Sequence, residues 1–325
     1  MRVLLTGSSG WLGKVLAPML AEQGHDVTGF DIAPGEYTGI VGSVSDHSMV
    51  DRAFSNADID AVIHAGGLHQ PDLARCPASA FVDTNVQGTL NMLEASRAAG
   101  VDRFVFTSTT SLMASEAVHS GTSSKAVWFD ESYAPLEPRN VYGVTKLAAE
   151  QLCRLHSLQH RMNCIALRPG RFFPGEDSAQ PDLSADNHKA NEFLNCRLMV
   201  DDVARAHVLA LERAPALGFD TFILSAPTPF VRDDANDLKR DAKAVIGRLF
   251  PEAARLFARR GWQLPASISR VYDSSNSQSV LGLRYDTRFS DILTALREGE
   301  DLPFATDRSP GCEQNPDLQR MEKDL

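Results

Sequence analysis

Tyr142 and Lys146 are four positions apart, a spacing that places both side chains on one face of a helix, one turn apart. A tyrosine hydroxyl ordinarily has a pKa of about 10, and a neighbouring ammonium favours the phenolate and lowers that value. The hydroxyl-rich run 107–109 follows an apolar stretch, and its side chains would lie close to Tyr142 and Lys146. Taken alone, a Tyr-x-x-x-Lys pair is more often a solvent-exposed pair without function than a catalytic one. Together with the features below, it predicts proton transfer at a carbinol oxygen.

The second chemical feature is a glycine loop at the start of the chain. Gly7, Gly10 and Gly13 follow an apolar stretch, predicted as a strand, and open an amphipathic stretch, predicted as a helix. Glycines allow a tight turn and close approach of a pyrophosphate, and a helix N-terminus attracts it. Asp31, at the end of the next strand, would accept hydrogen bonds from a ribose diol and repel a 2′-phosphate. The loop therefore predicts bound NAD rather than NADP, and its alternative is a glycine-rich turn without a ligand.

The elements that must position these residues alternate along the first 170 residues. Apolar runs predict strands at 2–6, 27–31, 38–42, 61–65, 103–107 and 164–168, and amphipathic runs predict helices at 11–23, 48–55, 78–99 and 140–159. This order is typical of the α/β class: a doubly wound parallel sheet, or Rossmann fold.

The remaining chain predicts a smaller, mostly helical C-terminal substrate lobe. We assign residues 1–170 to the NAD-binding domain, with 198–226 returning to it as a helix and a strand at 221–225. Residues 171–197 and 227–305 form the lobe, with an extended stretch at Val271-Tyr272. The polar tail 306–325 is expected to be disordered.

Composition limits the function further. The chain has 325 residues, 43% of them hydrophobic, and a formal net charge of −10. We therefore expect neither a nucleic-acid partner nor a membrane partner. The five cysteines are scattered and show no metal-binding spacing, so we predict no metal site and a cytoplasmic location.

Several motifs occur in an order that resembles the extended short-chain dehydrogenase/reductases, specifically the NAD-dependent epimerase/dehydratase family, which includes UDP-galactose 4-epimerase. The resemblance covers residues 1 to about 210 and loosely 269–285. The matching segments are Thr6–Gly13, Asp31, 62–67, 85–89, 106–109, 142–146, 167–169 and 200–204.

The resemblance implies roles for individual residues. Tyr142 is the catalytic acid/base, Lys146 its partner, and Thr109 the hydroxyl that orients the substrate oxygen. Asn85 would either contact the cofactor or only tie a helix to the sheet. The full set implied to bind the cofactor is Gly7, Gly10, Trp11, Leu12, Gly13, Asp31, Ser43, Val44, Ala65, Gly66, Gly67, Asn85, Thr107, Tyr142, Lys146 and Pro169.

The sequence also departs from the family pattern. Dehydratases have Asp-Glu after the catalytic threonine, where this chain has Thr110-Ser111, so dehydration is disfavoured. Ser43 replaces the usual acidic residue near adenine, which puts that contact in doubt. Thr109, Thr110 and Arg171 are the predicted substrate contacts. Arg171 replaces the usual asparagine and would bind a carboxylate or phosphate, or else form a salt bridge.

Segment lengths bear on the substrate. The segment 171–197 is about half as long as in nucleotide-sugar enzymes, which favours a smaller substrate, and the insertion 111–128 could cover the site. We predict an NAD-dependent epimerase or dehydrogenase that acts on a sugar, sugar acid or nucleotide sugar. The alternative is an NAD-binding regulatory or scaffold protein without turnover. Helices 78–99 and 140–159 resemble the family's dimer-forming pair and imply a homodimer.

Overall fold

The computed structural model describes residues 1–55, 58–172 and 183–304. Its centre is a parallel sheet of seven strands in the order β3-β2-β1-β4-β5-β7-β8. The doubly wound α/β fold class is therefore confirmed. The predicted strands are present with ends shifted by one or two residues, as follows: β1 (Arg2–Thr6), β2 (Asp26–Asp31), β3 (Thr38–Val41), β4 (Ala61–His64), β5 (Arg103–Thr107), β7 (Asn163–Pro169) and β8 (Phe219–Leu224).

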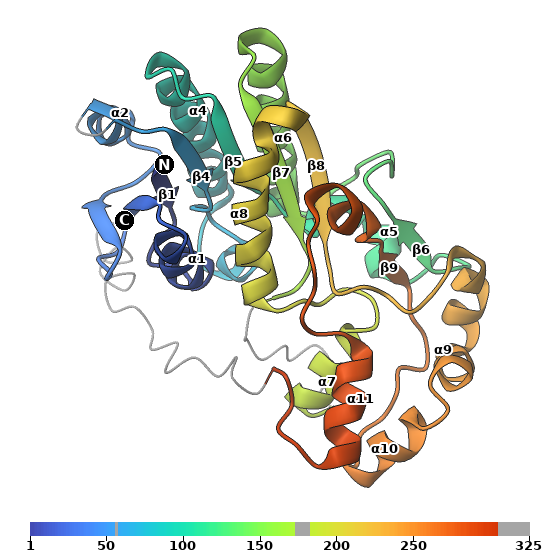
Figure 1. The fold of residues 1–325 in the computed structure, drawn as a ribbon. Helices are drawn as coiled ribbons and strands as arrows, with labels where there is room; N and C mark the ends of the chain where they lie inside the picture. Colours follow the sequence, from blue (N-terminus) through green and yellow to red (C-terminus); the bar gives the residue numbers. More distant parts are fainter. Residues whose placement is uncertain (56–57, 173–182, 305–325) are drawn as a thin grey trace.

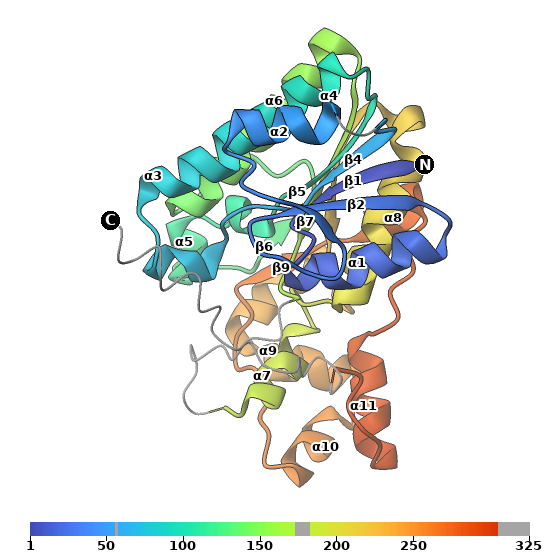
Figure 2. The ribbon, with the colours of Figure 1, turned by 90° about the vertical axis from the view of Figure 1, so that its left-hand side faces the viewer.

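Helices cover both faces of the sheet (Figure 2). Neighbouring strand residues point to opposite faces, so Val3 and Leu5 pack under α1 (Trp11–Glu22) and α8 (Val200–Leu217). Leu4 points the other way. The helices on its face are α2 (His47–Ser55), α4 (Gly88–Ala98) and α6 (Val141–His160). This alternation buries the strands on both sides and directs their carboxyl ends to one edge.

The predicted helix 78–99 is interrupted, which corrects the expectation of one regular helix. It consists of α3 (Ala78–Phe81), a π-helical segment η2 (Val82–Gln87), and α4. A π-turn inserts one residue into a helix and is common at functional sites. Here it turns the buried side chain of Asn85 toward the sheet edge, where it bonds to Leu68.

The C-terminal lobe lies at the bottom of Figure 1, beyond the end of the sheet where α1 begins. Its core includes Phe193, Phe257 and Phe289. The strand β9 (Arg270–Tyr272) contains the predicted extended pair and is parallel to β6 (Val127–Phe129). The helices of the lobe are α7 (Ala185–Glu192), α9 (Ala235–Leu249), α10 (Ala253–Arg259) and α11 (Phe289–Glu298).

Short elements complete the chain: the 3₁₀ turns η1 (Gln70–Ala74), η3 (Thr110–Met113) and η4 (Arg232–Asp234), the helix α5 (Glu116–His119) and the π-turn η5 (Ser277–Leu281). The predicted tail 306–325 lies outside the described residues. Among the helices that are described, none combines the length and apolarity needed to cross a membrane.

Candidate active site

The glycine loop between β1 and α1 is packed so tightly that side chains would not fit. Gly7 has a φ of +75°, and a Cβ there would lie 2.8 Å from the Gly66 nitrogen. A Cβ on Gly13 would lie 2.1 Å from the Gly7 carbonyl oxygen, and one on Gly10 3.2 Å from the same atom. Because no real Cβ approaches that closely, the loop needs glycine at Gly7 and Gly13 for its own shape.

The start of α1 fits an anionic group. In the part of the chain that the structure describes, its first turn has no acidic residue and its N-cap, Gly10, no side-chain hydrogen bond. The backbone N–H groups of Trp11, Leu12 and Gly13 precede the first intrahelical bond, which Lys14 N donates to the Gly10 carbonyl. The buried Trp11 Nε1 also has no partner among the described residues. This end of the helix therefore suits a dinucleotide pyrophosphate.

Asp31 is oriented by the same loop. Its two carboxylate oxygens accept hydrogen bonds from the backbone nitrogens of Ser9, at 2.9 Å, and Ala33, at 3.0 Å. A carboxylate held in this way at the end of β2 can still accept bonds from a ribose diol, because each oxygen has a second lone pair. Val44 is buried against α4, and the hydroxyl of Ser43 bonds to that of Ser45.

The segment after β4 lies against the glycine loop. The backbone nitrogen of Gly66 donates to Thr6 Oγ1, at 2.9 Å, and a Cβ on Gly67 would lie 2.8 Å from Asn85 Oδ1. Asn85 bonds to both the nitrogen and the carbonyl of Leu68, and its Nδ2 donates to Thr145 Oγ1. These bonds are those of the structural alternative, in which Asn85 ties the helix to the sheet.

Tyr142, Lys146 and Thr109 meet at the carboxyl edge of the sheet. Asn140 caps α6 by accepting a bond from the Gly143 nitrogen, which places Tyr142 and Lys146 in the first two turns. All three side chains are buried, and the phenol of Tyr142 lies near the hydroxyl of Thr109. The Lys146 ammonium lies 4.4 Å from the ring centroid of Phe106.

The pKa of Tyr142 does not move in the expected direction. Burial raises the pKa of its phenol to about 12, although the nearby hydroxyl of Thr109 acts in the opposite sense. Burial also lowers the pKa of Lys146 to about 8, because a buried ammonium loses its hydration. At neutral pH the phenol of Tyr142 therefore keeps its proton.

The hydroxyls of two residues with predicted ligand contacts, Thr107 and Thr110, already bond to partners within the protein. The Thr107 hydroxyl bonds to Nε2 of the buried His207 at 2.7 Å, so it faces α8. The Thr110 hydroxyl donates to the carbonyl of Pro169 at 3.2 Å. Because a threonine hydroxyl has only one proton, neither can donate a further bond while these bonds persist.

Arg171 belongs to a group of charges that we call the ionic cluster, formed by Glu192, Arg171, His188 and Arg197. Glu192 accepts Arg171 Nε at 3.0 Å, Arg197 Nε at 2.8 Å and His188 Nε2 at 3.2 Å. Burial alone would raise the pKa of Glu192, but these partners lower it to about 2. The salt-bridge alternative is therefore realised for Arg171, whose side chain is still 32% exposed.

Sequence reasoning missed two features of this edge. Tyr272 comes from the lobe, lies near the hydroxyl of Thr110 and stacks on Phe129. Residues of the 111–128 insertion, Leu112 and Val118, are buried in the same apolar cluster as Tyr272, so this part of the insertion is packed. The sequence did show Tyr272 in the predicted extended pair. It could not show that Tyr272 would lie near Thr110, because the two residues are far apart in sequence.

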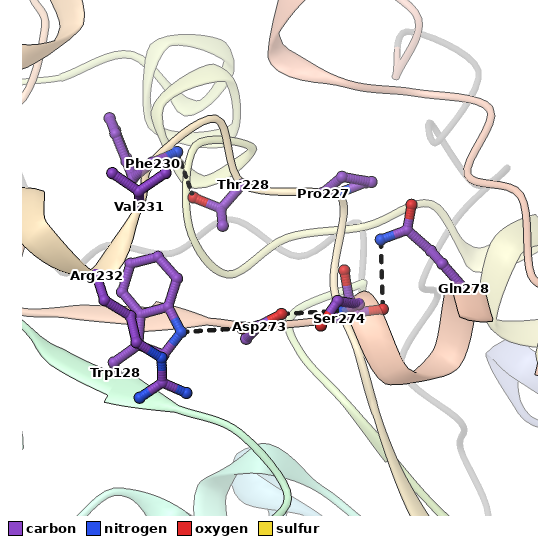
Figure 3. Close-up of a pocket in the computed structure, with 10 residues that line it drawn as sticks. Trp128, Pro227, Thr228, Phe230, Val231, Arg232, Asp273, Ser274 and Gln278 are labelled. Carbon is purple, nitrogen blue, oxygen red and sulfur yellow. Dashed lines mark hydrogen bonds between the residues drawn. The ribbon is translucent and has the colours of Figure 1, made fainter. Parts of the chain in front are cut away.

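The structure also contains a hollow of about 310 Å³, whose lining residues are drawn in Figure 3. Trp128, Arg232 and Asp273 line it, and the Trp128 indole N–H donates to Asp273 at 3.0 Å. None of the predicted catalytic or cofactor residues lines this hollow.

Comparison with known proteins agrees with this geometry. The model of the NAD dependent epimerase/dehydratase family matches residues 3–220. A 3-beta-hydroxysteroid dehydrogenase from Mycolicibacterium neoaurum is 31% identical, over 94% of this chain and 92% of that protein. A UDP-glucose 4-epimerase from Corynebacterium glutamicum is 28% identical, over 92% of this chain and 94% of that protein.

A solved structure shares the fold over its whole length. It is a short-chain dehydrogenase/reductase superfamily protein from Agrobacterium tumefaciens with bound NAD, 24% identical, with a TM-score of 0.65 over 100% of this chain and 99% of that chain. The matched family model covers more than half of the chain and includes both the glycine loop and Tyr142. The chain is therefore an NAD-dependent enzyme that belongs to the NAD-dependent epimerase/dehydratase family.

Proposed function

We propose that the chain transfers a hydride between a carbinol carbon of a sugar, sugar acid or nucleotide sugar and NAD, with Tyr142 as the acid/base. The observation that carries the proposal is the contact between the buried Tyr142 phenol and Thr109, one helical turn from Lys146. The glycine loop and this pair lie at the same edge of the sheet. When bound, NAD supplies the hydride-accepting chemistry.

The protein residues have separate parts in this proposal. In the direction of carbonyl reduction, Tyr142 donates its proton to the substrate oxygen, and in the reverse direction it receives that proton. Thr109 orients the oxygen through its hydroxyl. Lys146 lies one helical turn from Tyr142, and its positive charge favours the ionised form of the phenol.

The short segment 171–197 supports a small substrate. Part of it forms α7, whose Glu192 is occupied by the cations of the ionic cluster. A panel of free sugars, uronic acids and nucleotide sugars, assayed by NADH absorbance, would identify the class. Copurified NAD distinguishes the two outcomes: tightly retained NAD supports an epimerase, and its absence supports an exchanging dehydrogenase.

Replacing one buried phenol tests the proposal. We expect Tyr142→Phe to lower kcat by about 10²–10⁴-fold while NAD binding is retained, because only the proton-transfer group is removed. Tyr285→Phe is the matched control, since Tyr285 is equally buried (6% exposed, against 7% for Tyr142) and its phenol bonds to a hydroxyl, that of Ser277. Equal activity of both variants, or NAD binding without turnover of any substrate in the wild type, would overturn the proposal and favour a binding protein.

We further propose that α3, η2 and α6 form a homodimer interface. Val82, Val144, Leu155 and Leu158 are exposed by 43–71% on these elements. Val144, Leu155 and Leu158 fall on one face of α6, and uncovered apolar faces of this kind mark association surfaces. Light scattering would reveal a dimer mass, and a monomer mass would refute the interface.

A further inference from the structure

A chain of neutral hydrogen bonds runs behind the proposed active site. We call Gly66, Thr6, His64, Thr89 and Asn85 the relay. The Gly66 nitrogen donates to Thr6 Oγ1 at 2.9 Å, and Thr6 Oγ1 lies 2.7 Å from His64 Nδ1. His64 Nε2 lies 3.1 Å from Thr89 Oγ1, which donates to the Asn85 carbonyl at 2.7 Å. The relay thus joins β1, β4 and the interrupted helix.

The direction of every proton in the relay is fixed. Thr89 gives its single proton to the Asn85 carbonyl, so it can only accept from His64 Nε2. With its proton on Nε2, His64 must accept at Nδ1, and Thr6 donates there. Thr6 remains an acceptor for the Gly66 nitrogen. Only the neutral Nε2–H form of His64 satisfies all of these groups.

The surroundings of His64 favour that neutral form. Its side chain is 1% exposed and packs between the rings of Phe104 and Phe106, with centroids 6.0 and 5.8 Å away. Burial, and then the charge of Lys146, lower its pKa to about 3. His64 therefore adds no charge beside Lys146 at any ordinary pH.

The far end of the relay reaches the catalytic helix. The side chain of Asn85 bonds to the nitrogen and carbonyl of Leu68, and its Nδ2 donates to Thr145 Oγ1 at 3.1 Å. Thr145 Oγ1 in turn donates to the backbone carbonyl of Tyr142 at 3.0 Å. Because these hydrogen bonds are buried or partly buried and follow one another without a gap, they connect His64 to both the 66–68 segment and the backbone of Tyr142.

We propose that His64 is a positioning residue. Through Thr89 and Asn85 it fixes the position of the glycine-rich 66–68 segment relative to the helix that carries Tyr142. The catalytic part of this inference rests on the proposed function. The part that concerns cofactor binding does not, because the 66–68 segment touches the glycine loop directly. His64 itself transfers no proton to substrate.

Thr89 offers the sharpest test, because a matched control lies on the same helix. Thr89 and Ser96 are both fully buried in α4, and each hydroxyl donates to the carbonyl four residues earlier, at 2.7 and 2.6 Å. Thr89→Val removes the link to His64. Ser96→Ala removes an equivalent bond that lies outside the relay, and Thr89→Ser restores the hydroxyl.

Three measurements on the full chain separate positioning from mere stability. We expect Thr89→Val to weaken NAD binding about tenfold in calorimetry, to lower kcat about 10–100-fold and to speed amide exchange at Gly66 and Leu68. Thr89→Ser and Ser96→Ala should stay within about twofold of the wild type in all three. In ¹⁵N NMR, wild-type His64 should show the Nε2–H tautomer unchanged from pH 5 to 8.

The outcomes distinguish the two proposals. If wild-type turnover is absent but Thr89→Val still weakens NAD binding and speeds exchange, the proposed reaction fails and the relay stands. If the wild type turns over substrate while Thr89→Val matches Ser96→Ala in NAD affinity, kcat and exchange, the relay is refuted. Titration of His64 between pH 5 and 8 would also refute it.

Discussion

The relay and the ionic cluster hold neighbouring parts of the site by opposite means. In the relay, every member is neutral and each proton has one direction. In the ionic cluster, the single carboxylate of Glu192 serves Arg171, His188 and Arg197. Directed neutral bonds fix geometry without adding an electric field, whereas a shared carboxylate depends on its charge. The difference predicts different responses to substitution and pH.

The largest effect should come from neutralising the centre of the ionic cluster. We expect Glu192→Gln to lower the free energy of unfolding by about 3–5 kcal/mol, because it leaves the buried guanidinium of Arg197 and the partly buried one of Arg171 without their carboxylate. Urea unfolding would measure the loss. Glu252→Gln is the control in the same lobe, since Glu252 pairs with the half-exposed Arg297 at 2.9 Å and should cost less than about 1 kcal/mol. Similar losses of unfolding free energy in Glu192→Gln and Glu252→Gln would show that the ionic cluster does not differ from an ordinary surface salt bridge.

Asp202 is a buried carboxylate without the several cationic partners that surround Glu192, so it tests how a carboxylate behaves outside the ionic cluster. Burial raises its pKa to about 7, although the Asp286 backbone N–H and Arg205 act against this, and its Oδ2 has no partner among the described residues. A raised folded-state pKa means that stability is lost as pH rises toward 7. Asp202→Asn should therefore gain about 2 kcal/mol relative to the wild type between pH 5 and pH 7. A gain independent of pH would contradict the assignment.

The smallest effect concerns His207, which is as fully buried as His64. His207 donates from Nδ1 to the Val203 carbonyl at 2.7 Å, and burial lowers its pKa to about 4. Because its folded-state pKa lies below the unfolded value, its contribution is lost as pH falls below about 6.5. His207→Asn can keep the bond to Val203 without titrating. Between pH 7 and pH 5.5 it should lose about 1 kcal/mol less stability than the wild type, as measured by urea unfolding at each pH.

The cofactor half of the molecule could be predicted from local sequence. Gly7 and Gly10 lie between β1 and α1 and Gly13 lies in the first turn of α1, as their spacing indicated, because a tight turn imposes glycine within a few residues. The position of Tyr142 and Lys146 on one buried helix face followed from helical periodicity. Their roles in binding and catalysis remain predictions.

The rest could not be predicted, because it depends on partners distant in sequence. The hydroxyl of Thr107 is bonded to His207, and Thr110 contacts Tyr272, from a strand of the other lobe. The π-turn around Asn85 leaves the hydrophobic periodicity on either side nearly regular. The raised pKa of Tyr142 arises from burial, which the Tyr-x-x-x-Lys spacing does not reveal.

A carboxylate binds a backbone amide at the outer edge of the main sheet. Strand β8 is the last strand, and its Ile223 nitrogen donates to Glu131 Oε1 at 2.8 Å. Exposed strand edges invite pairing with other chains, and a carboxylate at an edge amide blocks such pairing. Burial raises the pKa of Glu131. Glu131 thus occupies one amide of the outer strand that a further strand would otherwise need for pairing.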